Sequence, residues 1–143
     1  MQKFYVEERV RWRDVDHAGI VRYDAYLRFF EFAEMEFFRA LGLPFAQVHE
    51  LLGIWMPRVQ MHCDFHSPAR LDDLLRIAVY VSYLRRTSMR FDFEIDTEGR
   101  RLVSGYLVIV TVDRERFSPI EVPQELRTRL TPYVAKDVLT ALT

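Results

Sequence analysis

A segment near the N-terminus combines two carboxylates with a histidine, a glycine and a tyrosine: Asp14, Asp16, His17, Gly19 and Tyr23. The segment has no sustained hydrophobic period, so we predict a loop that leads into a helix. The first turn of a helix has unpaired backbone N–H groups and a partial positive charge of about half a unit. Gly19 lets the backbone approach a bound group, and a carboxylate on the loop would face whatever the N–H groups polarise. The pattern therefore indicates acyl-transfer chemistry.

The element that must position this loop is a helix over residues 24–41. Apolar residues recur there at steps of three and four without Gly or Pro, and Gly42 and Pro44 then end the pattern. Other faces of the helix are also partly apolar, so we expect it to be buried on more than one side, with its aromatic face in the core. The recurring residues are Tyr26, Phe29, Phe30, Ala33, Phe37, Ala40 and Leu41.

Five segments have the composition of β-strands, one before the helix and four after it. A Pro-containing turn, a polar corner and a tight hairpin separate the last four, which we predict to form an antiparallel meander. Residues 77–84 and 102–112 are richest in β-branched and aromatic residues and are predicted as central strands. Short helices are expected around 45–52 and 122–130. The five strand segments are 4–12, 55–66, 73–84, 88–96 and 101–113.

One long helix with five antiparallel strands predicts an α+β fold in which a curved sheet wraps around the helix. A chain of 143 residues suits one domain, which we assign to residues 1–143. A curved sheet leaves free edges, and free edges usually mean dimerisation.

Composition narrows the function classes. Half of the residues are hydrophobic and 29% are charged, with a net charge of −1, so nothing favours a nucleic-acid partner, and no apolar run suits a membrane span. Cys63 is the only cysteine, which excludes an internal disulfide and a multi-cysteine zinc site. The first residues alternate and carry charge where a signal peptide would be apolar, so we expect a cytoplasmic protein.

The pattern Asp-x-Asp-x-x-Gly-x-Val-x-Tyr at 14–23, followed by Tyr26, resembles the 4-hydroxybenzoyl-CoA thioesterase family and its Tol-Pal-associated relatives, which have the hotdog fold. Residues 68–74, Pro-Ala-Arg-Leu-Asp-Asp-Leu, are similar to a segment of the Tol-Pal-associated members. Residues 85–88, Arg-Arg-Thr-Ser, resemble the basic corner before another family strand. The similarity runs in the same order from about residue 5 to about residue 115.

The resemblance implies hydrolysis of a small or medium acyl-CoA, aliphatic or aromatic, to the free acid and CoA. Asp16 falls on the catalytic carboxylate, acting as nucleophile or as general base on water, and both roles stay open. The backbone N–H of Tyr23 would polarise the thioester carbonyl, and Gly19 belongs to the same site. The residues that would bind CoA are Arg85, Arg86 and Ser88.

The resemblance also implies a homodimer with the site between two subunits, and a tetramer of two dimers stays open. Coenzyme A would be part of the substrate and product, so no further cofactor is expected. The loop residues His17, Ala18 and Gly19 are intermediate between the two subfamilies, so neither subfamily's acyl group is assigned.

Simpler interpretations exist for several of these residues. Asp16 could only cap the loop, and Asp14 is expected to be structural. Three polar residues, His62, Asp64 and His66, share one face of a strand and could hold a metal, but such alternation is typical of a half-exposed strand, and we predict no metal site.

Two other functions compete with acyl-CoA hydrolysis. One is release of acyl groups from acyl carrier protein, which would require a complementary basic surface. The other is a non-catalytic protein that binds acyl thioesters, although the intact Asp16 and Gly19 argue against it. The catalytic His motif of hotdog dehydratases and hydratases is not found.

Overall fold

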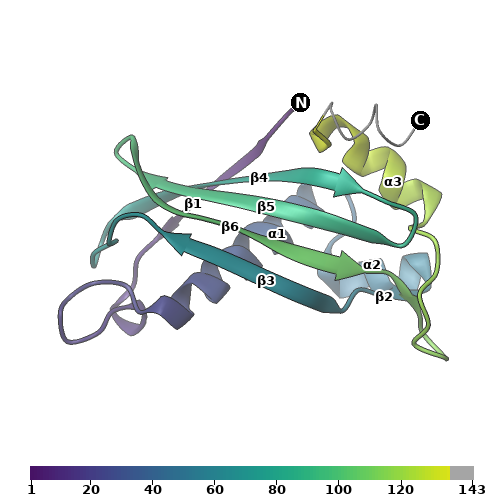
Figure 1. Cartoon of the computed structure of the whole chain (residues 1–143), viewed down its shortest axis with the longest axis horizontal. Coiled ribbons are helices and arrows are strands. Elements are labelled where there is room, and N and C mark those ends of the chain that lie inside the picture. Colours follow the sequence, from purple (N-terminus) through teal and green to yellow (C-terminus); the bar gives the residue numbers. More distant parts are fainter. Residues whose placement is uncertain (136–143) are drawn as a thin grey trace.

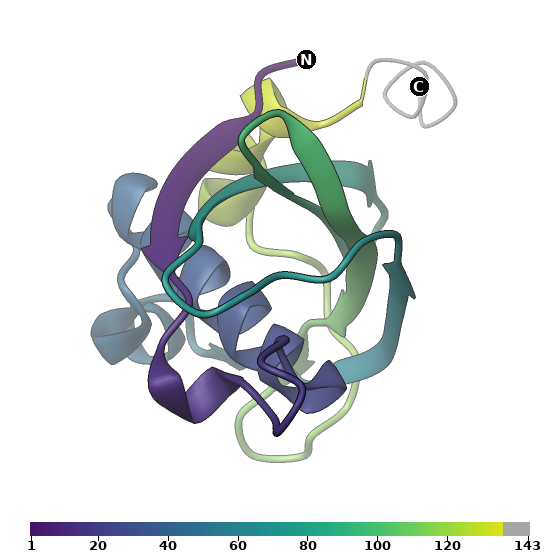
Figure 2. The ribbon, with the colours of Figure 1, turned by 90° about the vertical axis from the view of Figure 1, so that its left-hand side faces the viewer.

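The computed structural model describes residues 1–135, and it shows one curved antiparallel sheet around one long helix (Figure 1). The helix α1 spans Tyr26–Ala40 and lies inside the curve of the sheet, as the end-on view shows (Figure 2). The expected domain 1–143 includes residues 136–143, which lie outside the described residues. The strands of the sheet are β1 (Phe4–Arg9), β3 (Arg58–Phe65), β4 (Leu74–Leu84), β5 (Ser88–Thr97) and β6 (Arg100–Val110).

The strand order β1-β4-β5-β6-β3 corrects one prediction. The meander comprises only β4, β5 and β6, because β3 pairs with β6 and not with its sequence neighbour β4. The two segments predicted as central, β4 and β6, are interior strands that flank the middle strand β5. Composition identifies strands that are buried on one face, but it does not report which edge receives an incoming strand. The consequence is that β3 forms a free edge of the sheet.

The ends of the elements follow local backbone chemistry. The strand expected over 4–12 ends at Arg9, because Trp12–Asp14 form a 3-10 turn, and another such turn at Tyr23–Ala25 precedes α1. The expected tight hairpin between β5 and β6 is confirmed, with positive φ at Glu98 (49°) and Gly99 (75°), as a type I′ turn requires. The shorter elements are α2 (Phe45–Leu52), β2 (Ile54–Trp55), β7 (Val112–Asp113), α3 (Gln124–Leu130) and a 3-10 turn at Thr131–Tyr133.

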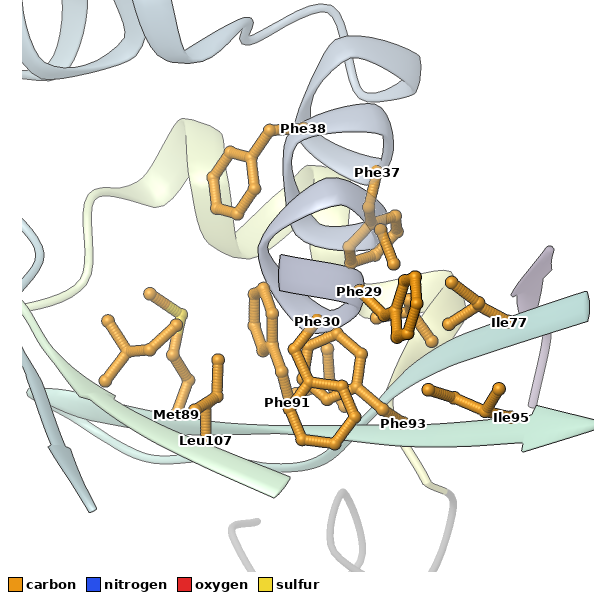
Figure 3. Close-up of a cluster of buried hydrophobic side chains, with 14 of the residues drawn as sticks. Phe29, Phe30, Phe37, Phe38, Ile77, Met89, Phe91, Phe93, Ile95 and Leu107 are labelled. Carbon is orange, nitrogen blue, oxygen red and sulfur yellow. The ribbon is translucent and has the colours of Figure 1, made fainter. Parts of the chain in front are cut away.

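The core forms where the aromatic face of α1 meets the inner face of the sheet (Figure 3). Phe30 is fully buried and stacks on Phe93 of β5, with ring centroids 4.5 Å apart. Gly105 of β6 makes this approach possible: a Cβ there would lie 2.4 Å from the carbonyl oxygen of His62 and 2.8 Å from the Phe30 ring. The absence of a side chain at Gly105 therefore allows the helix to pack closely on β6.

Among residues 1–135, no helix combines the length and the apolar character that a membrane span requires.

We predict that Gly105→Ala lowers the free energy of unfolding by about 1–3 kcal/mol, the usual effect of an extra methyl group in a packed core. Denaturant unfolding of the two proteins measures the difference. Unchanged stability would contradict the close packing of Phe30 over β6.

Candidate active site

The segment with the predicted chemistry folds as a small hairpin in front of α1. The N–H of Asp16 donates to the carbonyl of Ile20 (3.0 Å), and the N–H of Gly19 donates to the carbonyl of Asp16 (3.0 Å). Gly19 has a φ of 77°, the left-handed conformation that follows a turn in a three-residue hairpin loop. Val15 and Val21 pair below the turn. Gly19 therefore shapes the loop that presents Asp16.

Asp16 is exposed at the base of this turn. Its Oδ1 accepts a hydrogen bond from the N–H of Ala18 (2.8 Å), which is the local capping role that an aspartate has in many turns. No hydrogen bond to Oδ2 is found among residues 1–135. The local bond therefore orients the carboxylate and engages only one of its two oxygens.

Asp16 and Tyr23 line the same pocket. The pocket has a volume of about 370 Å³ and is also lined by Tyr26 of α1 and by Phe65 and His66 at the end of β3. Tyr23 begins the 3-10 turn before α1, so its N–H has no partner within the helix. Burial raises the pKa of the Tyr26 hydroxyl, which therefore stays neutral at this site. A carboxylate thus lies beside the amide-rich tip of the helix.

A buried ion cluster holds the loop against α1, and its centre is Arg28, a residue that the sequence pattern did not indicate. The Nε and Nη2 of Arg28 donate to the two oxygens of Asp14 at 2.9 and 2.5 Å, and its Nη1 donates to Glu8 Oε2 at 2.9 Å. Asp14 and Glu8 are only 2% and 9% exposed. No signal in the sequence pointed to this role, because Arg28 is one of five charged residues in α1 and its position in the sequence identifies no partner.

Asp14 anchors the loop with both its side chain and its backbone, which supports the structural role expected for it. Its carbonyl accepts from the N–H of Arg22 (2.8 Å), directly before Tyr23. Burial alone would raise the pKa of the Asp14 carboxyl, but hydrogen bonds from Arg28 and from the N–H of Arg11 outweigh it and lower that pKa. Arg28 thus fixes the position of Asp14, and with it the start of the hairpin that carries Asp16.

The segment 68–74 supports the loop from the other side. Ala69 is fully buried, and its carbonyl accepts from the N–H of Val21 (2.9 Å). Arg70 pairs with Ile20, so the backbone of this segment lies against the hairpin. The match of residues 68–74 to a family motif therefore has a physical basis in the support of the Asp16 loop.

The three predicted CoA residues lie at the opposite end of the sheet from Asp16. Arg85 and Arg86 are exposed in the β4–β5 corner, and Ser88 begins β5. Asp16 instead lies near the start of β4. The start of β4 and the β4–β5 corner are separated by roughly 33 Å along the strand. Arg85 lies over the ring of Tyr83 at 4.1 Å. One chain by itself does not bring these residues to Asp16.

The remaining polar candidates, on β3 and directly after it, contact separate partners. His62 contacts Asp64 at 3.0 Å, whereas His66 contacts Ser104 at 2.7 Å. Among residues 1–135, no group of three His, Cys, Asp or Glu side chains could hold a metal ion. Burial raises the pKa of Cys63 to about 11, so this half-buried thiol is not a nucleophile at neutral pH. His17 is exposed on the hairpin next to Asp16.

Known proteins agree with this architecture. Residues 10–130 match the family model of the thioesterase-like superfamily, and the chain belongs to this superfamily. It is 27% identical over 119 residues to the acyl-CoA thioesterase YbgC of Haemophilus influenzae, which covers 83% of this chain and 88% of that protein. It is 29% identical to the acyl-CoA thioester hydrolase YbgC of Escherichia coli O6:H1, with coverage of 82% and 88%.

Solved structures confirm the expected hotdog fold. The 1,4-dihydroxy-2-naphthoyl-CoA thioesterase Slr0204 from Synechocystis superposes with a TM-score of 0.84 at 20% identity, covering 91% of this chain and 96% of that one. The gentisyl-coenzyme A thioesterase BH1999 superposes with a TM-score of 0.80 at 26% identity, covering 89% and 99%.

We predict that Arg28→Gln lowers the free energy of unfolding at pH 7 by about 3 kcal/mol, as expected when a buried ion pair loses one partner. The pKa values of Glu8 and Asp14 are lowered in the folded protein from ordinary values of 4.5 and 3.8. Their stabilising contribution is therefore present above those values and disappears as the pH falls through the folded pKa. The difference between native protein and variant should shrink below about pH 4 in denaturant unfolding.

Arg39→Gln is the matched control, because Arg39 lies on the same helix in an exposed pair with Glu36 (3.5 Å). Its effect should stay within about 1 kcal/mol. Equal effects of the two substitutions, or a difference that does not depend on pH, would contradict the role of the buried cluster.

Proposed function

We propose that this protein is a thioester hydrolase that converts a small or medium acyl-CoA, aliphatic or aromatic, to the free acid and CoA. One observation carries the proposal: Asp16 lines one pocket with Tyr23, the residue at which the turn before α1 begins. An N–H group at a helix tip stabilises the negative charge that develops on the carbonyl oxygen of an attacked thioester. The acyl-CoA activity of the two YbgC relatives supports the same substrate class.

Asp16 has two possible roles that share one geometry. As a nucleophile, its carboxylate attacks the thioester carbon, the C–S bond breaks, CoA leaves as the thiolate, and water then hydrolyses the mixed anhydride. As a general base, Asp16 removes a proton from a water molecule that attacks the same carbon, and the thiolate takes up a proton. Gly19 serves both routes by giving the loop the turn that presents the carboxylate.

We further propose a homodimer formed through the free edge of β3. Val59, Met61 and Phe65 of this strand are 60%, 42% and 56% exposed, which is unusual for large apolar side chains on a strand. A free, apolar edge strand is a template for pairing with a second copy. In antiparallel pairing about a two-fold axis, the β4–β5 corner of one subunit approaches the Asp16 end of the other.

This arrangement supports a role for Arg85, Arg86 and Ser88 in binding the CoA of the partner's active site. Two exposed arginines suit phosphate groups, since guanidinium forms charge-assisted hydrogen bonds with phosphate oxygens. CoA then belongs to the substrate and product, and no separate cofactor is proposed. A tetramer of two dimers and a cytoplasmic location stay predictions.

Asp16→Asn should lower kcat by roughly 10²- to 10⁴-fold, the range for loss of a proton-transfer group, while binding of acyl-CoA is retained. Thiol release from a panel of acyl-CoAs measures turnover, and calorimetry measures binding. Asp24→Asn is the control, because Asp24 is an exposed carboxylate in the turn before α1 and pairs only loosely with Arg22 (3.5 Å). If the native protein binds acyl-CoA without turnover, the result would favour a non-catalytic protein that binds acyl thioesters. If it releases acyl groups only from acyl carrier protein, the result would favour an acyl-carrier-protein thioesterase.

A site shared by two subunits predicts complementation. Asp16→Asn and the double variant Arg85→Ala/Arg86→Ala should each be weak, because each lacks one half of every site. Mixing the two proteins and allowing subunit exchange should restore thiol release, since one of the two sites in a mixed dimer has both halves intact. Mixing Asp16→Asn with a chain that carries all three substitutions is the control and should restore nothing. A lack of complementation despite demonstrated exchange would place the whole site within one subunit.

A further inference from the structure

The helix α1 does not lie centrally in the curve of the sheet. It packs closest to β1 and β4, and we call the space between α1 and the edge strand β3 the seam. Two hollows lie along this seam. One is the Asp16 pocket, and the other is a hollow of about 560 Å³ between α1, α2 and β3, which we call the seam pocket. Its volume lies within the range of small-molecule sites.

Both hollows are lined by one face of the α1 region and by one face of β3. Leu27 and Phe30 line the seam pocket. Leu27 follows Tyr23 by four residues and Phe30 follows Leu27 by three, so the three side chains lie on one face of the helix. On β3, Phe65 lines the Asp16 pocket and Met61 lines the seam pocket, four residues away and therefore on the same face.

The two hollows share no lining residue, and the rings of Tyr26 and Phe65 contact each other between α1 and β3 with centroids 5.4 Å apart. An acyl chain would therefore pass from one hollow to the other along Leu27, which is 49% exposed.

The walls of the seam pocket are mainly apolar, as an acyl group requires. These apolar side chains come from the helix, from α2 and from two strands. They are Leu27, Phe30, Met35, Phe45, Met61 and Leu107.

A buried ion pair stands at the far end of the seam pocket. Glu34 is 2% exposed, and its Oε1 contacts Nη2 of Arg58, which comes from the start of β3. Nη1 of Arg58 donates to the carbonyl of Met56 at 2.5 Å. Tyr23 and Glu34 are separated by roughly 16 Å along the helix axis, which is the length available to an acyl group.

We propose that the seam pocket receives the acyl part of the substrate, and that Glu34 and Arg58 select medium-length acyl groups with a hydroxyl at the far end. This inference rests on the proposed hydrolase function and deepens it. The seam, the apolar walls and the polar end define one elongated acyl site that begins at Asp16.

The selection follows from the hydrogen-bonding capacity of the pair. A guanidinium has five N–H donors, and the two contacts of Arg58 engage two of them. A hydroxyl can accept from Arg58 and donate to Glu34 at the same time. A plain alkyl end would displace water from the Arg58 guanidinium and the Glu34 carboxylate. It would offer no hydrogen bonds in place of those made by the water, and the loss is costly in a buried site.

The charges in the pocket disfavour an acyl group that ends in a carboxylate. Glu31 and Glu34 both line the pocket beside the single arginine, Arg58. His49 adds no positive charge at neutral pH, because burial lowers its pKa and Arg114 lowers it further. A neutral oxygen is therefore the group that this end can accommodate.

The first test asks whether the acyl group occupies the seam pocket. Asp16→Asn protein, which retains the substrate, is titrated with hexanoyl-, octanoyl-, decanoyl- and dodecanoyl-CoA, and the dissociation constants are compared with those of the same protein carrying Met61→Trp. The indole should fill the pocket and weaken binding of the longer chains by roughly tenfold or more, relative to binding of acetyl-CoA by the same variant. Gln60→Trp is the matched control, because Gln60 is adjacent on β3 but faces the outer side of the sheet, where it contacts Tyr106.

The second test concerns the ion pair. The native enzyme should prefer ω-hydroxydecanoyl-CoA over decanoyl-CoA by roughly ten- to a hundredfold in kcat/KM, the range for a hydrogen bond to a charged group, and should reject the ω-carboxy analogue. Arg58→Met/Glu34→Gln removes both charges together, so no unpaired buried charge remains. This double variant should lose the preference while retaining hydrolysis of acetyl-CoA.

The two proposals fail in different ways. Lack of turnover on every acyl-CoA overturns the hydrolase function, and the binding titrations still report on the seam pocket. An unchanged chain-length profile in Met61→Trp, or equal kcat/KM for the hydroxylated and plain chains in an active native enzyme, overturns this inference and leaves the hydrolase function standing.

Discussion

Arg28 connects the helix, the first strand and the loop in front of the helix through one guanidinium. It donates to both oxygens of Asp14 and to Glu8, and Asp14 in turn accepts from backbone groups on either side of the Asp16 hairpin. Because both carboxylates are buried, neither can lose this partner without a large desolvation cost. The position of the Asp16 carboxylate relative to the helix tip depends on this cluster.

The packing of α1 determines the rest of the site. The side chain of Phe30 connects the helix to the middle of the sheet, because its ring stacks on Phe93 of β5 and lies over Gly105 of β6. The helix leans toward β1 and β4, and the side near β3 is left hollow. This position of the helix leaves the hollow beside β3 in which we propose that the acyl group binds.

The free edge at β3 explains why one chain holds only part of the proposed site. Asp16 lies at one end of the sheet and Arg85 at the other, so a two-fold pairing of β3 would combine complementary ends. The proposed dimer would therefore both cover the exposed apolar edge and bring together the two parts of the proposed site.

Local patterns in the sequence were sufficient for the helix, the strands, the hairpin at Glu98–Gly99 and the nearness of Asp16 to Tyr23, because those features depend on neighbours within a few residues. The sequence did not show that β3 pairs with β6, or that Arg28 holds Asp14 and Glu8, because these contacts join residues far apart in the chain. It also did not show the hollow beside Glu34 and Arg58. Periodicity reports which face of an element is buried, whereas the identity of the partner on that face and any space left between them arise only when the elements pack together.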